Sequence, residues 1–321
     1  AGTLLHALGW LSPLGWAGRV EAYGANRQWV LLLGLGALVV GVGIGVAVLD
    51  RRDLGAGLIP ARNGPSRGGA LLSSPLGLVT RLARGTVIGW SIGITLGAIA
   101  IGSLLGSVAD LADDEVIQEF LRRLAGSAGT IEDIFVATEV RFVAVAVTAS
   151  GVALVLRLVG AERSGLGEVV LTTPVSRTRW YAAHVAVSLV LVTALMALFG
   201  LVLGLVGSAV TPLAPSVGAA VAASLSTAPA VWVVVGVAAL LCGALPRFAP
   251  FAWGVLLVAF VVGELGTTMG LPSWVIDASP FAHLSQLPGG SFELVSAVVL
   301  TAVAAALVVA GWAAYRRRDA V

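Results

Sequence analysis

The stretch AERSGLGEVVLTTPVSRTRWY, residues 161–181, decides how the rest of this chain folds. It is a polar and charged interruption between two long apolar runs, residues 135–158 and 182–206. Each run is long enough to cross a bilayer, because about 20 apolar residues that rise 1.5 Å each span its hydrocarbon core. We therefore expect two membrane-spanning helices joined by a short polar segment.

Within that segment the spacing predicts one short amphipathic helix. Leu166, Val169 and Val170 recur at positions i, i+3 and i+4, which is the pattern of an apolar helix face. Pro174 should end this helix, because proline lacks the amide donor and crowds the preceding turn. Ser176 suits the N-cap of the next helix. A short surface helix held between two spanning helices is well placed to move both of them when another protein pushes it.

The composition is that of a polytopic membrane protein. Hydrophobic residues make up 58% of the chain and charged residues only 11%, whereas about a quarter of a soluble domain is charged. All 19 basic residues are arginine, which excludes a Walker A phosphate loop and lysine Schiff-base chemistry. The only cysteine, Cys242, lies in an apolar run, and the three histidines are far apart. We expect no metal site and no catalytic residue.

Seven apolar segments are expected to span the membrane, which makes the fold all-α. They are residues 29–49, 86–108, 135–158, 182–206, 219–245, 251–263 and 294–314. Residues 74–84, SPLGLVTRLAR, read as an amphipathic helix lying in the interface. Residues 266–291 are too apolar for a free loop and too broken for one spanning helix. Short re-entrant helices are expected there, because irregular backbone at membrane depth must be packed in protein or line a cavity.

The arginines indicate the orientation of the chain. Alternate segments hold fourteen arginines on one side (50–85, 157–180, 246–250 and 315–321) and five on the other (1–28, 109–141 and 264–293). The arginine-rich side should be cytoplasmic. This places residues 161–181 and the C-terminus inside, and residues 266–291 outside.

An internal repeat points to two related halves. Ser12-Pro13 precedes a span that ends in Arg-Arg-Asp at 51–53, and Ser279-Pro280 precedes a span that ends in the same tripeptide at 317–319. The separation from Ser to Asp is 41 residues in the first case and 40 in the second.

Three parts are expected from this repeat. Residues 1–53 would be the end of a first transmembrane half, 54–85 a cytoplasmic linker with the interfacial helix, and 86–321 a six-span half. An N-terminal portion is then expected to precede the chain, or to be supplied by a second permease chain.

Charged residues near the ends of the spans leave several interpretations open. Glu139 and Arg141 lie near the outer end of the third span, as an interfacial structural pair or as the outer lip of a substrate path. His184 suits a hydrogen bond at the inner interface better than a proton relay. Asp113, Asp114 and Glu115 could suggest metal-assisted glycosyl transfer, but consecutive carboxylates are more typical of a helix start. No carboxylate lies at the centre of the other spans, which argues against an ion-coupled carrier.

Bulky apolar residues in the spans are candidates for the wall of a hydrophobic substrate cavity, although each also suits a lipid-facing or interfacial position. They are Trp90, Met196, Phe199, Trp232 and Phe260.

Residues 171–180, LTTPVSRTRW, behind Glu162 and Glu168, resemble the first cytoplasmic loop of ABC-2 type permeases. More narrowly, they resemble the family of exporters of polyketide antibiotics. The motifs RRDLGAG at 51–57, SPLGL at 74–78 and SPFAH at 279–283 are similar to the same family, so the resemblance covers nearly the whole chain. Such permeases have two six-span halves in a bacterial cytoplasmic membrane.

The resemblance implies a coupling helix at about 162–172 that docks on a separate ATP-binding subunit, working as a dimer with ATP and Mg. It also implies an elbow helix at 74–84 and re-entrant helices at 266–287. This chain itself would bind no cofactor and no nucleic acid and would not be an enzyme. The implied contacts with the ATPase are Glu162, Arg163, Glu168, Leu171, Pro174, Ser176 and Arg177. We expect Glu168 to be the docked charge, since it lies next to Val169 and Val170.

The expected function is therefore that of the permease subunit of an ATP-driven exporter of hydrophobic or amphipathic compounds. The alternatives are an ion-coupled secondary transporter and a membrane scaffold or sensor. The partners would be the ATPase, the missing half, membrane lipid and a hydrophobic small molecule.

Overall fold

The computed structural model describes residues 26–50, 74–112 and 130–318, together with residues 10, 16, 19, 20, 69 and 72; of residues 109–112 and 171 it describes the backbone only. These ranges contain helices and turns and no strand. The chain divides into two units, Ala1–Arg67 and Gly68–Val321. The expected acidic helix start at 113–115 and the residues 51–53 and 319 of the repeat lie outside the described residues.

The described part of the first unit contains one candidate membrane span. A 3-10 turn, η2 (Gln28–Val30), leads into α3 (Leu31–Asp50). Every residue of α3 before Asp50 is apolar, and none of them is buried. A helix that is apolar on all sides is stable only against lipid or other protein.

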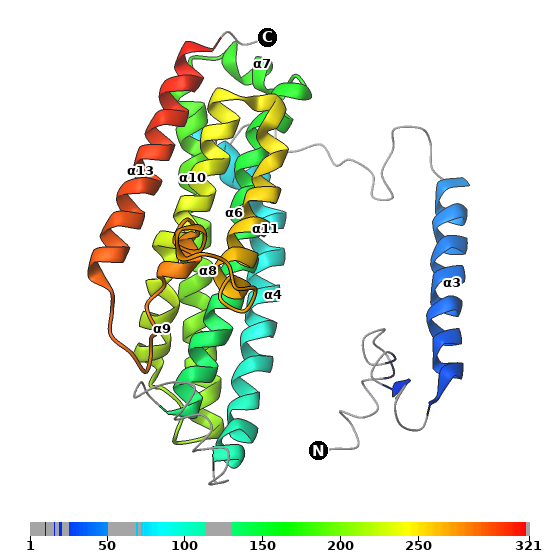
Figure 1. Cartoon of the computed structure of the whole chain (residues 1–321). Coiled ribbons are helices and arrows are strands. Elements are labelled where there is room, and N and C mark those ends of the chain that lie inside the picture. The colour runs from blue at the N-terminus through cyan, green and yellow to red at the C-terminus, as the bar shows by residue number, and fades with distance from the viewer. Residues whose placement is uncertain are drawn as a thin grey trace. The chain divides into compact units, whose positions relative to one another are not determined.

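The second unit is a bundle of long helices (Figure 1). Its spans are α4 (Pro75–Ala112), α6 (Ile131–Arg163), α8 (Arg177–Val210), α9 (Val217–Ser226) with α10 (Ala228–Ala244), α11 (Ala252–Phe260) with its flanking turns, and α13 (Leu294–Arg317). With α3, seven helical segments in the described ranges are long and apolar enough to cross a membrane. The all-α fold with seven expected spans is therefore confirmed.

Helix α4 differs from the expectation at its start. The separate interfacial helix expected at 74–84 is instead the first part of one continuous helix of 38 residues. No proline follows Pro75 in this stretch, so nothing interrupts the hydrogen-bonded ladder. The first turns of α4 also pack in the bundle, because Val79 and Ala83 are buried. At 1.5 Å per residue α4 is about 57 Å long, which exceeds the hydrocarbon thickness of a bilayer.

The fifth expected span, 219–245, is broken in two. Helix α9 ends at Ser226 and α10 begins at Ala228, with Pro229 in its first turn. Proline has no amide hydrogen and is tolerated at a helix start, where that donor would have no partner. The hydroxyl of Thr227 donates to the carbonyl of Ser224 at 2.8 Å, which gives this buried carbonyl at the end of α9 a hydrogen-bond donor.

The core of the bundle lies among α6, α8 and α10, and α13 packs against α10. The contact between α10 and α13 is a close approach of backbones, because a Cβ on Gly243 would overlap the carbonyl of Gly311. Small residues allow such close packing between membrane helices. The largest fully buried side chains of this core include Trp180, Tyr181, Phe199 and Met196.

The sixth span is short and is followed by broken helical turns. The turn η4 (Pro246–Phe251) precedes α11, the π turn η5 (Val261–Leu265) follows it, and α12 (Ser273–Ile276) and η6 (Pro280–His283) come next. The segment 273–283 lies against the bundle at the level where α11 ends, well short of the far ends of α4 and α8 (Figure 1). The depth of these turns in a membrane stays a prediction.

Candidate functional site

The polar stretch between α6 and α8 forms a short helix, α7 (Leu166–Leu171), at one end of the bundle (Figure 1). Gly165 precedes it with a φ of 74°, a left-handed conformation that glycine adopts without strain and that reverses the chain. The helix ends three residues before Pro174. The amide of Arg179 donates to the hydroxyl of Ser176 at 3.4 Å, so Ser176 is the N-cap of α8 as expected. Residues 162 and 163, expected in the short helix, belong to α6.

Helix α7 turns one apolar side chain inward and others outward. Val170 is buried, whereas Val169 is 65% exposed and Leu166 is 40% exposed. Val169 therefore does not pack against the bundle with Val170, although the i, i+3, i+4 spacing predicts that the two share one apolar face. Glu168 is exposed and has no salt bridge among the described residues. The exposed parts of Leu166, Glu168 and Val169 are here called the α7 surface.

Glu162 and Arg177, both expected to contact a partner, are bound within the chain. The Nη2 atom of Arg318 lies 2.5 Å from Oε1 of Glu162, and its Nη1 donates to the carbonyl of Cys242 at 3.1 Å. Arg177 donates to the carbonyl of Arg318 at 2.9 Å. Glu162, Arg177 and Arg318, here called the C-terminal clasp, tie the end of α13 to α6, α8 and α10. The sequence holds no signal that pairs Arg318 with a residue 156 positions away.

The remaining expected ATPase contacts lie around α7. Arg163, Pro174 and Ser176 are exposed, and the side chain of Leu171 is outside the described residues. Of the seven expected contacts, Glu168 and Arg163 are the charged side chains left outside the clasp.

The expected substrate-path residues have different surroundings in the structure. Met196 and Phe199 are fully buried in the core, and Trp232 donates its indole N–H to the hydroxyl of Thr193 at 3.0 Å. Phe260 packs edge-on against Phe142. Trp90 is half-buried on α4.

Glu139 and Arg141 do not form the expected pair, because residues two apart on a helix face different sides. Arg141 lies instead 3.8 Å from Glu264 of η5, which ties α6 to the end of α11. The Nδ1 atom of His184 lies 3.0 Å from the carbonyl of Trp180, which is the structural hydrogen bond favoured from the sequence.

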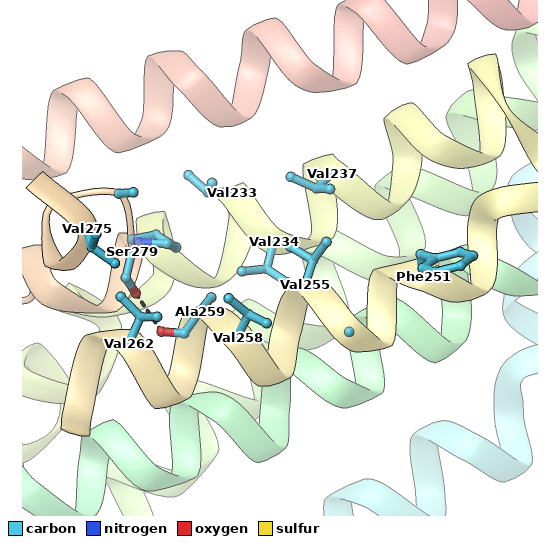
Figure 2. Close-up of a pocket in the computed structure, with 13 residues that line it drawn as sticks. Val233, Val234, Val237, Phe251, Val255, Val258, Ala259, Val262, Val275 and Ser279 are labelled. Atoms are coloured by element: carbon cyan, nitrogen blue, oxygen red, sulfur yellow. Dashed lines mark hydrogen bonds between the residues drawn. The ribbon is translucent and has the colours of Figure 1, made fainter. Parts of the chain in front are cut away.

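An apolar groove that the sequence did not indicate lies between α10, α11 and the segment 275–280. Its volume is about 590 Å³. Valines of α10 stand opposite valines of α11, with Val275 and Ser279 at one end and Phe251 at the other (Figure 2). The hydroxyl of Ser279, its only side-chain polar group, donates to the carbonyl of Ala259 at 2.6 Å. The groove therefore suits an apolar ligand or an acyl chain.

Within the described ranges no three His, Cys, Asp or Glu side chains come together as a metal site. The sequence did not point to one buried carboxylate, that of Glu132 near the start of α6. Glu132 is 2% exposed, and its Oε1 has no hydrogen-bond partner among the described residues.

Comparison with known proteins gives the family. Residues 72–316 match the family described as the multidrug efflux system permease Rv1217c, C-terminal domain. The multidrug efflux system permease protein Rv1217c of Mycobacterium tuberculosis (strain ATCC 25618 / H37Rv) is 36% identical over 314 residues, which are 97% of this chain and 57% of that protein. The chain thus spans a little over half of this relative, and the family match covers the second unit from just before α4 almost to the end of α13. The resemblance to ABC-2 type permeases is confirmed by this match, and the chain belongs to the family of the C-terminal domain of the permease Rv1217c.

Proposed function

We propose that this chain is part of the membrane subunit of an ATP-binding cassette exporter that moves hydrophobic or amphipathic compounds out of the cell. A separate ATPase subunit, working as a dimer, binds ATP and Mg and supplies the energy. The chain itself is then a permease and not an enzyme. Membership of a permease family supports this proposal.

The observation that carries the proposal is the α7 surface. Helix α7 is held at both ends by long helices, α6 of 33 residues and α8 of 34 residues. It exposes Leu166 and Val169 beside the charge of Glu168. An exposed apolar patch with a charge at its edge suits a docking site for another protein. A partner that pushes α7 tilts α6 and α8 directly, because only short turns separate the three helices.

ATP can drive such a movement only if it has a higher affinity for one conformation of the complex than for the other. Closure of the ATPase dimer would supply that difference and open a path on the opposite side. We place α7 and the C-terminus in the cytoplasm of a bacterial cell, as the arginine distribution favours. A first permease half, in the same chain or in a second one, would complete the transporter.

We assign the apolar groove between α10 and α11 to the substrate path, in place of the bulky apolar residues that the sequence suggested. Its volume of about 590 Å³ is in the range of small-molecule sites. An apolar wall distinguishes its ligands weakly, because one methylene changes binding by only about 1–3 kcal/mol. The substrates would therefore share hydrophobicity more than shape.

An ion-coupled carrier is the second candidate, and one observation favours it. Glu132 is a buried carboxylate whose Oε1 has no hydrogen-bond partner in the described part of the chain, as in sites that bind and release protons.

The two functions are distinguished by energy source. The complete transporter in membrane vesicles should keep exporting a hydrophobic dye when a protonophore is added at constant ATP. Loss of export under that condition would favour the ion-coupled carrier.

A further inference from the structure

A second cavity lies beneath α7, at the end of the bundle where α4 and α8 begin and α6 ends. Its volume is about 290 Å³, about ten times the space that one water molecule occupies in the liquid. Its polar lining comes from Arg157, Ser164, Trp180 and His184, and no carboxylate of a described residue lines it. The lining thus offers hydrogen-bond donors without a negative charge.

The guanidinium of Arg157 is held by neutral acceptors. Nη1 donates to the carbonyl of Leu82 at 2.9 Å, and Nη2 donates to the hydroxyl of Thr86 at 2.6 Å. Neither salt bridge between described residues involves Arg157. Since a guanidinium carries five N–H donors, three remain for a ligand. An arginine fixed in this way suits a phosphate, whose oxygens match the planar fork.

Trp180 supplies a second donor. Its side chain is fully buried and lines the cavity, and its indole N–H has no hydrogen-bond acceptor among the described residues. A buried donor without an acceptor is costly, so a ligand oxygen there would be stabilising. His184 adds an acceptor: its Nδ1 must donate to the carbonyl of Trp180, which leaves Nε2 of the neutral ring to accept from a hydroxyl.

The rest of the cavity is apolar. Val79, Leu82, Leu154 and Leu166 line it, so a bound anion would carry an apolar tail. The same end of α4 presents Arg81 and Arg84, both exposed. Basic pockets between membrane helices on the cytoplasmic side bind anionic lipid head groups.

We propose that this cavity binds the phosphate of an anionic membrane glycerophospholipid, with Arg157 and Trp180 on the phosphate and His184 on a head-group hydroxyl. Leu166 of α7 lines the same cavity, so the bound lipid contacts the short helix from beneath. The proposal rests on the cavity alone and does not require an ATPase partner or an export activity.

Native mass spectrometry of the complete permease in mild detergent tests this, with phosphatidylglycerol and phosphatidylcholine added in turn. Wild type should retain one phosphatidylglycerol at least tenfold better than phosphatidylcholine. Arg157→Gln should lose at least tenfold of that retention, and Trp180→Phe, which removes the indole N–H, should lose several-fold. The matched control is Arg163→Gln, an exposed arginine near the same helix end that does not line the cavity.

Equal retention by Arg157→Gln and Arg163→Gln would overturn the proposal. Millimolar inorganic phosphate should leave lipid retention unchanged; displacement of the lipid by phosphate would show a site for free anions instead. If Arg157→Gln does not fold, Trp180→Phe decides alone: full retention of phosphatidylglycerol by that variant contradicts the assignment of the phosphate to the indole.

Discussion

At the residue scale, the C-terminal clasp determines which charges near α7 are free for a partner. The guanidinium of Arg318 binds both the carboxylate of Glu162 and the carbonyl of Cys242. Both charged side chains of this pair are only about one-fifth exposed, at 21% and 22%. A partly buried pair of this kind leaves one charge unpaired when the other is removed, so its loss costs more than the loss of a surface ion pair.

We therefore expect Arg318→Gln to destabilise the bundle. Loss of hydrogen bonds to a charged group costs about 1.5–3 kcal/mol. Thermal unfolding of the complete permease in detergent should show a lower midpoint for Arg318→Gln, whereas the neighbouring exposed Arg317→Gln should stay close to wild type. The double variant with Glu162→Gln should be less destabilised than the sum of the two single variants. Additive effects would mean that the pair contributes no coupling energy.

At the element scale, α13 is attached to the bundle through its close contact with α10. A Cβ on Gly243 would overlap the backbone of Gly311, and a Cβ on Gly311 would lie 2.8 Å from the carbonyl of Ala239. Backbone atoms cannot turn aside as a flexible side chain can, so the two helices must separate if either glycine gains a side chain.

Gly243→Ala should therefore destabilise the protein, by about 1–3 kcal/mol as overpacked cores do. Gly97→Ala on α4 is the matched control, because its Cβ would meet nothing within 4 Å. Thermal unfolding in detergent compares the two. Equal midpoints for both variants would contradict the tight contact between α10 and α13.

The elements also show what could be predicted from the sequence. The spans could be predicted because long apolar runs have few other solutions in a membrane protein, and the N-cap at Ser176 follows from local chemistry. The break before Pro229 could have been predicted, because a proline inside an apolar run marks a helix start, and the continuity of α4 agrees with the lack of a proline after Pro75. The clasp could not be predicted, because it joins residues far apart in the chain and local patterns carry no information on such contacts.

At the scale of the whole molecule, the orientation of the bundle is a prediction from the arginines. The loop between α8 and α9 and the turn η4 lie at opposite ends of helical spans, and Leu213 and Arg247 are exposed there. In a Cys242→Ala background, Leu213→Cys should react with a membrane-impermeant maleimide in intact cells. Arg247→Cys should react only after permeabilisation. The reverse labelling would place α7 outside the cell.

The central claim for the whole molecule is that α7 couples this permease to an ATPase. A charge at a docking surface gains most when the partner's opposite charge meets it out of water, and loss of one member of such a pair costs about 2–5 kcal/mol. A charge that stays in solvent contributes only about 0–1 kcal/mol. Glu168 is the carboxylate that the α7 surface leaves unpaired among the described residues.

The most direct test is co-purification of the ATPase subunit with the tagged, complete permease, together with substrate-stimulated ATP hydrolysis of the complex. Glu168→Arg should reduce ATPase binding by at least about tenfold, since 1.4 kcal/mol corresponds to one factor of ten, and should lower stimulated hydrolysis. Glu293→Arg is the matched charge reversal, at an exposed acidic residue that directly precedes α13 and does not line the groove, and it should leave both unchanged. If Glu168→Arg retains the ATPase subunit and its stimulated hydrolysis at the wild-type level, α7 is a solvated loop and does not couple the permease to ATP.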